Sequence, residues 1–151
     1  MDHTTEIKQI IEELLQRMGV RAVIEESEAV EGMYFQIKTS EGGVLIGENG
    51  QNLLALHYIA RRILEKRYPK EPIHFSIDIN DYQRKKIEEI KERARMGAQR
   101  VRYFKKEVIL QPMSAYERRI IHMTLAEDPD IITESRGEGE TRSVVIKPAQ
   151  Q

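Results

Sequence analysis

The sequence has no cysteine, no tryptophan and few other aromatic residues, and each absence excludes something. Without cysteine, neither a disulfide framework nor a thiolate metal site can form. With 3 phenylalanines and 6 tyrosines among 151 residues, aromatic side chains on which a planar ligand could stack are scarce. No apolar run approaches the roughly 20 residues that a membrane-spanning helix needs. Because the start, MDHTTEIKQI, is also acidic and polar rather than signal-like, we expect a cytoplasmic protein without membrane insertion.

Positive charge is concentrated in one segment, which the whole-chain total conceals. The net charge is -1, and the hydrophobic (40%) and charged (32%) fractions are those of a folded chain. Residues 81–122 hold 12 lysines and arginines against 6 acids, whereas residues 1–80 hold 9 against 13 and residues 123–151 hold 3 against 6. This distribution indicates a basic patch that can meet an anionic partner.

The apolar spacing in residues 1–80 predicts a small α+β unit of order αββααβ. Apolar residues recur at helical spacing from residue 4 to residue 18, and Gly19 ends that helix. Strand-like runs follow at 20–25 and 33–39, on either side of a polar turn. A glycine-containing segment then passes into a helix, and residues 73–79 alternate as a last strand does.

Residues 81–151 predict a second α+β unit, of order αβαββ. A long, basic helix is expected from residue 81 to residue 104, with Asn80 as its N-cap and Gln83 at the capping-box position. A short strand at 108–110 precedes a second helix that begins at a capping box, Ser114 with Glu117. Two strand-like runs, 131–135 and 142–146, surround a glycine-rich turn, and this pattern predicts a hairpin.

The stretch IGENGQNLLALHYIARRIL places two glycines, Gly47 and Gly50, at the start of a helix. Taken alone this is a tight turn, but glycines at a helix start also let a backbone approach phosphate. With its surrounding elements, the segment resembles a K-homology (KH) domain of the bacterial arrangement over residues 4–80. The resemblance implies that the loop admits a sugar-phosphate backbone and that Ile46 and Leu53 line the floor beneath the bases.

The two middle residues of this loop, Glu48 and Asn49, depart from the basic or polar pair that is frequent in KH domains. A carboxylate about 4 Å from a phosphate costs on the order of 1 kcal/mol in high dielectric. We therefore expect a weakened phosphate contact here.

Arg118 and His122 lie four residues apart on the helix that begins at the capping box, so they share one face. A solvated basic helix face is the alternative interpretation. With QPMSAYE before it and TESRGEGETRSVVIKP after it, the pair resembles the Arg-x-x-x-His domain, a module that binds single-stranded nucleic acid, over residues 81–148. The resemblance implies that Arg118 and His122 contact phosphate or a base, with Arg119 in support.

Other arginines could extend this basic surface, although basic helices are more commonly just solvated. We expect few acids near the arginines of the long helix, and we expect the arginines beside the hairpin turn to lie on the same surface as Arg118. The candidates are Arg93, Arg100, Arg102, Arg136 and Arg142.

In this order the two modules resemble the bacterial Jag family, the SpoIIIJ-associated RNA-binding proteins also called KhpB. The resemblance implies binding of single-stranded RNA (or single-stranded DNA), and a post-transcriptional regulator or RNA chaperone linked to cell division, elongation and cell shape. It also implies association with another KH-type protein or a second copy. Many members carry a further N-terminal domain, whereas this sequence starts at the KH helix, so the resemblance does not extend to roles tied to that domain.

Enzyme chemistry has little support in the sequence. The four histidines (His3, His57, His74, His122) lack metal-ligand spacing, and Ser114 is better explained as a helix cap than as a nucleophile. We expect no catalysis, no cofactor and no metal. The rival hypothesis is a protein-interaction adaptor whose KH unit serves dimerisation rather than RNA binding.

Overall fold

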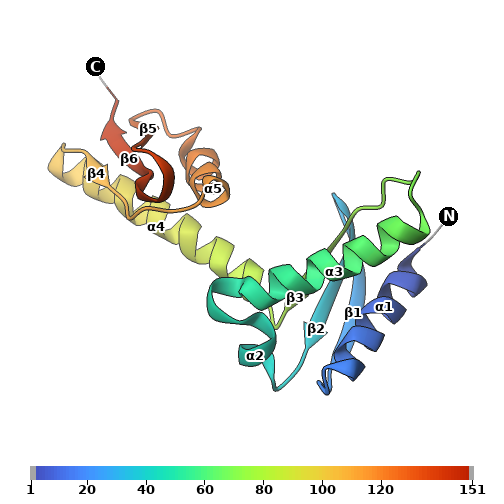
Figure 1. Cartoon of the computed structure of the whole chain (residues 1–151). Helices are drawn as coiled ribbons and strands as arrows, with labels where there is room; N and C mark the ends of the chain where they lie inside the picture. Colours follow the sequence, from blue (N-terminus) through green and yellow to red (C-terminus); the bar gives the residue numbers. More distant parts are fainter. Residues whose placement is uncertain (1–2, 150–151) are drawn as a thin grey trace. The chain divides into compact units, whose positions relative to one another are not determined.

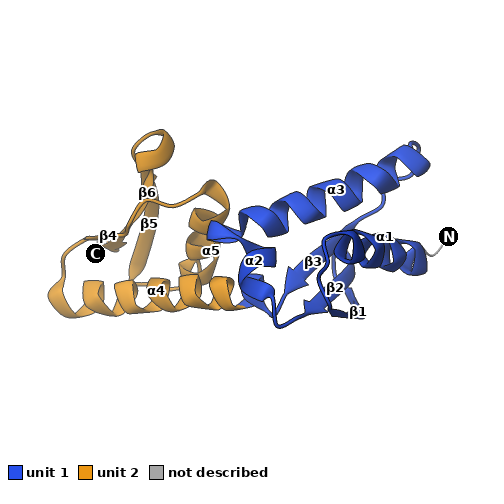
Figure 2. Cartoon of the chain, turned by 60° about the horizontal axis from the view of Figure 1, so that its bottom comes forward, with its two compact units in different colours: residues 1–84 blue, residues 85–151 orange. Residues whose placement is uncertain are grey.

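A computed structural model describes residues 3–149 of the chain, which divides into two compact units, residues 1–84 and 85–151 (Figure 2). The expected boundary, after residue 80, lies in the turn before a long helix. The boundary between the compact units, after residue 84, lies within the first turn of that helix. Both units mix helices and strands, so the expected α+β class is confirmed. Among residues 3–149, no helix combines the length and apolar character that a bilayer crossing requires.

The first unit has the expected order αββααβ (Figure 1). Its sheet has the order β1-β2-β3, with β1 antiparallel and β3 parallel to β2. A parallel pair needs a crossover connection, and the segment that carries the two glycines supplies it. Its elements are α1 (Thr4–Arg17), β1 (Val23–Ala29), β2 (Gly32–Lys38), α2 (Gly42–Ile46), the 3-10 turn η1 (Glu48–Gly50), α3 (Gln51–Arg67) and β3 (Phe75–Ile79).

The core of the first unit lies between one face of this sheet and the helices α1 and α3. Phe35 and Ile37 of β2 and Ile77 of β3 are almost fully buried, and they belong to one apolar cluster with Ile11 of α1 and Leu56 of α3. The periodicity of both helices therefore has its expected cause, since the apolar face of each one covers the sheet.

The opposite face of the sheet carries a buried carboxylate that holds the start of α4 (Tyr82–Phe104). Asp78 is 1% exposed. It accepts hydrogen bonds from the backbone N–H groups of Gln83 at 2.9 Å and Arg84 at 3.4 Å, and from the Tyr34 hydroxyl at 3.1 Å. A carboxylate that accepts from the first N–H groups of a helix both caps the helix and complements its dipole.

The expectation that Asn80 caps α4 is wrong. Its side chain instead accepts from the backbone N–H of Thr39 and donates to the Thr39 carbonyl, at 3.1 and 2.8 Å. Asn80 also has a positive φ of 49°, a conformation that asparagine tolerates. It therefore closes the turn after β3 against the end of β2, and the cap comes from Asp78, two residues earlier.

Tyr34 is expected to make the first unit lose stability in alkaline solution. Burial, followed by the negative charge of Asp78, raises the pKa of Tyr34 to about 12 from 10.0. Because the folded state favours the protonated phenol, this stabilisation is complete below pH 10 and is lost as the pH rises towards 12. Thermal unfolding at pH 9, 10.5 and 11.5 measures it, and Tyr34→Phe is expected to lose less stability over this range than the wild type. Equal losses in both proteins would contradict the assignment.

The second unit has the expected order αβαββ, with the sheet order β4-β6-β5 and antiparallel pairing throughout (Figure 1). Ile121 of α5 and Val101 of α4 are fully buried and share an apolar cluster with Ile146 of β6. The predicted hairpin is confirmed as β5 paired with β6. After α4, the elements are β4 (Val108–Ile109), α5 (Ala115–Leu125), β5 (Ile131–Arg136), the 3-10 turn η2 (Gly139–Thr141) and β6 (Ser143–Pro148).

Candidate nucleic-acid interface

The glycine loop depends on backbone conformations that glycine adopts readily. Gly47 has φ 75° and ψ 178°, and Gly50 has φ 78° and ψ 14°. A Cβ on Gly47 would lie 2.6 Å from Cγ of Asn52, whose amide donates to the Val44 carbonyl at 2.8 Å. A Cβ on Gly50 would lie 3.1 Å from the ring of Tyr82. The loop is therefore a closely packed turn in which larger residues would be strained.

The N–H groups of the two glycines are used inside this turn. That of Gly47 donates to the Gly43 carbonyl at 3.0 Å, and that of Gly50 donates to the Gly47 carbonyl at 3.3 Å. The glycines thus shape the loop rather than donate to an anion, and the exposed part of the loop is formed by Glu48 and Asn49.

The structure places the two expected floor residues differently. Ile46, at the end of α2, is half-buried against the core of the first unit. Leu53 is 1% exposed and lies within that core. A base cannot reach Leu53, so its expected role beneath the bases is wrong. The apolar periodicity of α3 predicts that Leu53 faces the core, but it does not tell whether part of the side chain stays at the surface.

The predicted capping box at the start of α5 is confirmed, and it positions Arg118. Ser114 Oγ accepts from the Glu117 N–H at 3.2 Å, and a Glu117 carboxylate oxygen accepts from the Ser114 N–H at 2.9 Å. One turn in, the guanidinium of half-buried Arg118 donates to the Met113 carbonyl at 2.8 Å. One of its five N–H donors is thereby used, and the group is held in a defined orientation.

His122 lies against β5 rather than pointing freely outward. Its Nδ1 is 2.7 Å from the Thr133 hydroxyl, and its Nε2 is 2.9 Å from the Ser135 hydroxyl. Burial, followed by the positive charge of Arg118, lowers the pKa of His122. A neutral imidazole has one N–H and one acceptor nitrogen, so one hydroxyl accepts from the ring and the other donates to it.

The arrangement at His122 differs from that of a serine nucleophile site. In a serine nucleophile site, a carboxylate on Nδ1 stabilises the charged imidazole that forms during the reaction. Here Nδ1 faces the hydroxyl of Thr133, and the charge that lowers the pKa of His122 is the cation of Arg118. Both ring nitrogens are occupied, so a phosphate can be met by the unused N–H donors and the positive charge of Arg118, and by the hydroxyl that accepts from the ring.

The structure does not bring every expected arginine to this pair. Arg119 is exposed on α5, and Arg142 donates to the Gly137 carbonyl at 2.7 Å. Arg136 instead forms ion pairs with Glu107 and Glu134, at 3.2 and 2.7 Å. Strand alternation places Arg136 on the sheet face opposite to the one that meets His122, so the expected common surface is wrong for Arg136.

The expectation that few acids lie near the arginines of α4 holds for two of the three. The expectation is wrong for Arg102, which forms ion pairs with Asp128 at 2.6 Å and with Asp130 at 3.0 Å. Arg93 and Arg100 are exposed, and within residues 3–149 neither has an ion pair. Both line a hollow beside α4. In the described part of the chain, no group of histidines and carboxylates could hold a metal ion.

Sequence reasoning missed Thr133 and Ser135. They are two apart on a predicted strand, so they share one face, and that signal was readable. The sequence does not show which face of the strand meets α5, because that depends on how the hairpin packs on the helix.

Comparisons with known proteins find a family match in the second unit and relatives that align with both units. A family model for the R3H domain matches residues 85–148. The protein named RNA-binding protein KhpB of Clostridium symbiosum is 34% identical over 129 residues, which are 85% of this chain and 58% of that protein. The KhpB of Bacillus subtilis (strain 168) is 30% identical over 148 residues, 97% of this chain and 71% of the relative.

The KhpB of Streptococcus pneumoniae serotype 2 (strain D39) is 30% identical over 142 residues, which are 94% of this chain and 43% of that protein. This chain thus spans between 43% and 71% of the length of these relatives. Since the alignments run through both compact units, the chain belongs to the KhpB family and carries an R3H domain.

Proposed function

We propose that this protein binds single-stranded RNA without catalysis and that its second unit makes the principal contact. The observation that carries the proposal is the fixed Arg118 guanidinium next to the neutral His122, which is held between two hydroxyls of β5. The match to the R3H domain and the name of the relatives, RNA-binding protein KhpB, support the same function. Because tryptophan is absent and other aromatics are few, affinity is modest and sequence preference is weak.

The first unit serves as a KH domain that makes a secondary contact through the Gly47–Gly50 loop. The exposure of Glu48 and Asn49 at the middle of the loop supports this role, while the N–H groups of Gly47 and Gly50 stay within the turn. The carboxylate of Glu48 weakens the contact by on the order of 1 kcal/mol when a phosphate lies about 4 Å away.

An adaptor role of the first unit is the second candidate, and an apolar stripe on α3 favours it. Leu54, Tyr58 and Ile59 are 63%, 54% and 45% exposed. Such a stripe suits a KH-type protein partner or a second copy of the chain. Together, the two activities describe a cytoplasmic post-transcriptional regulator or RNA chaperone linked to cell division, elongation and cell shape.

Fluorescence anisotropy with a mixed-sequence single-stranded RNA at several salt concentrations tests the proposal. Each phosphate contact on a single strand lowers log K by about 0.7 per unit of log salt concentration, so three contacts give a slope of roughly -2. Single-stranded DNA and duplex RNA of the same sequence are the comparison ligands, and both are expected to bind more weakly. Binding that is absent, or that does not respond to salt, would overturn the proposal and leave the adaptor role.

Glu48→Lys is expected to raise the affinity for single-stranded RNA about fivefold, because it replaces a repulsive charge at the glycine loop with an attractive one. Glu31→Lys is the matched control, since Glu31 is also exposed in the first unit and the change in net charge is the same. The two titrations are run side by side at one salt concentration. An equal gain in both variants would show that net charge acts, and that the loop itself does not meet phosphate.

A further inference from the structure

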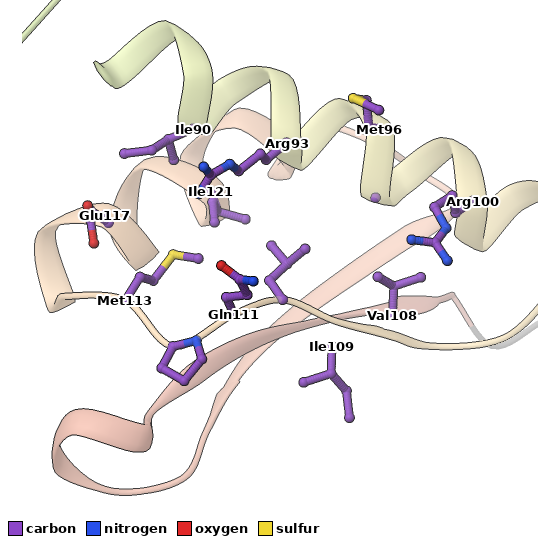
Figure 3. A pocket seen from close by; sticks show the side chains of 13 residues that line it. Ile90, Arg93, Met96, Arg100, Val108, Ile109, Gln111, Met113, Glu117 and Ile121 are labelled. Carbon is purple, nitrogen blue, oxygen red and sulfur yellow. The ribbon is translucent and has the colours of Figure 1, made fainter. Parts of the chain in front are cut away.

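The second unit has a hollow of about 490 Å³ between α4 and the segment that connects β4 with α5 (Figure 3). Its walls are mainly apolar and include Met96 from α4, Ile109 from β4, and Met113 just before α5. Met96 and Ile109 are 56% and 62% exposed, so the apolar surface is open to solvent. Hollows of about 300–1,000 Å³ are the size that small ligands and cofactors occupy.

The charge at this hollow is positive. Arg93 and Arg100 both line it, and neither has an ion pair within residues 3–149. They are seven residues apart on one helix, which corresponds to about 10 Å along α4. Glu117, an acid in the same lining, is already engaged, since it accepts from the Ser114 N–H and lies 3.6 Å from the Lys86 ammonium. An anionic partner therefore meets two uncompensated cations here.

The hollow adjoins the Arg118 site at Met113. The Met113 carbonyl accepts the hydrogen bond from Arg118, while Met113 also lines the hollow. A strand whose phosphate rests on Arg118 is thus close to the apolar walls. The side chain of Gln111, which is polar and uncharged, stands in the hollow, where its amide can both donate and accept (Figure 3).

We propose that this hollow is a nucleobase subsite for the bound single strand. One base enters between Met96 and Met113, the amide of Gln111 meets its edge, and the neighbouring phosphates contact Arg93 and Arg100. Apolar walls pack on the face of a base, and arginine binds phosphate, which together are the chemistry of a nucleotide rather than of an uncharged ligand. The inference rests on the proposed RNA binding and adds to it the place where a base is held.

Methyl-labelled protein, observed by NMR, separates base binding from phosphate binding. The two ligands are a single-stranded oligoadenylate and an abasic ribose-phosphate oligomer of the same length. The methyl resonances of Met96, Met113 and Ile109 are expected to shift with oligoadenylate and to stay in place with the abasic oligomer. Equal shifts with both ligands, or no shift while oligoadenylate is bound, would overturn the subsite.

Two matched pairs of variants test the walls and the charge. Met96→Gln is expected to weaken RNA binding about threefold, whereas Met18→Gln leaves it unchanged; the two methionines are 56% and 55% exposed, and Met18 lies at the end of α1. Arg100→Glu is expected to weaken binding about tenfold and to reduce the salt slope by roughly 0.7. Arg95→Glu, on the same helix but outside the hollow, is its control.

Failure of the subsite and failure of RNA binding give different results. If RNA binds but Met96→Gln matches Met18→Gln and the methyl resonances do not move, the subsite is wrong and the hollow is open to another occupant, such as an apolar peptide. If the wild type binds no RNA at any salt concentration, the proposed function fails as well.

Discussion

Arg118→Ala is expected to weaken the binding of single-stranded RNA about thirtyfold and to lower the salt slope by roughly 0.7. The Met113 carbonyl holds the guanidinium at 2.8 Å, and the capping box holds the start of α5, so the group is oriented before RNA arrives. A charge-assisted hydrogen bond contributes about 1.5–3 kcal/mol, and about 1.4 kcal/mol corresponds to tenfold in affinity. Arg118→Lys keeps the charge but loses the planar fork, so an intermediate loss is expected.

Arg95→Ala is the matched control for this variant. Arg95 is exposed on α4 and paired only weakly with Glu92 at 3.5 Å, so its loss removes the same charge without a fixed contact. Since the charge of Arg118 contributes to the lowered pKa of His122, Arg118→Ala is also expected to raise the pKa of His122. An NMR titration of the ring measures that shift independently of RNA. If both alanine variants bind RNA equally well, Arg118 is not part of the interface.

The order of elements was readable from the sequence because each unit buries one face of its helices and strands. Apolar spacing of 3.6 residues in α1 and of two in β3 reflects burial on one side, which is a local property of the chain. The capping box at Ser114 was equally local, since both partners lie within one turn. These features need no knowledge of what packs against them.

The features that the sequence pattern does not reveal are contacts that form where the chain turns back or between residues that lie far apart in the sequence. Asp78 reads as an outward polar residue of a strand, yet it caps a helix because the chain turns back at Asn80. Arg102 reads as an unbalanced cation, yet Asp128 and Asp130 approach it across the fold of the second unit. Each of these contacts is determined by how the elements pack within one unit.

The candidate site was predicted in part, for the same reason. Helical spacing identified Arg118 and His122 as neighbours, but not that β5 supplies a hydroxyl to each ring nitrogen of His122. The glycine loop was recognised by its residues, but the hydrogen bonds of Gly47 and Gly50 inside the turn were not visible in the pattern. Sequence thus locates the residues, and the fold decides which of their polar groups remain available to a ligand.

Asp78→Ala is expected to destabilise the first unit and the start of α4 by about 3 kcal/mol. The substitution removes a helix cap, which contributes about 1 kcal/mol. It also leaves the half-buried hydroxyl of Tyr34 without its acceptor, and an unsatisfied buried group costs about 1–3 kcal/mol. Asp78→Asn keeps one acceptor oxygen in nearly the same place, so a smaller loss is expected.

Hydrogen exchange is the appropriate measurement, because two compact units can unfold separately and a single unfolding curve would mix them. The amides of Gln83 and Arg84 are expected to lose protection in Asp78→Ala, while the amides of β6 keep theirs. Ser76→Ala is the control, since Ser76 points to the same face of β3 but is exposed. If the two alanine variants exchange alike, the carboxylate is not what holds the start of α4. If Asp78→Ala alone frees these amides, a single strand residue of the first unit sets where the long basic helix begins.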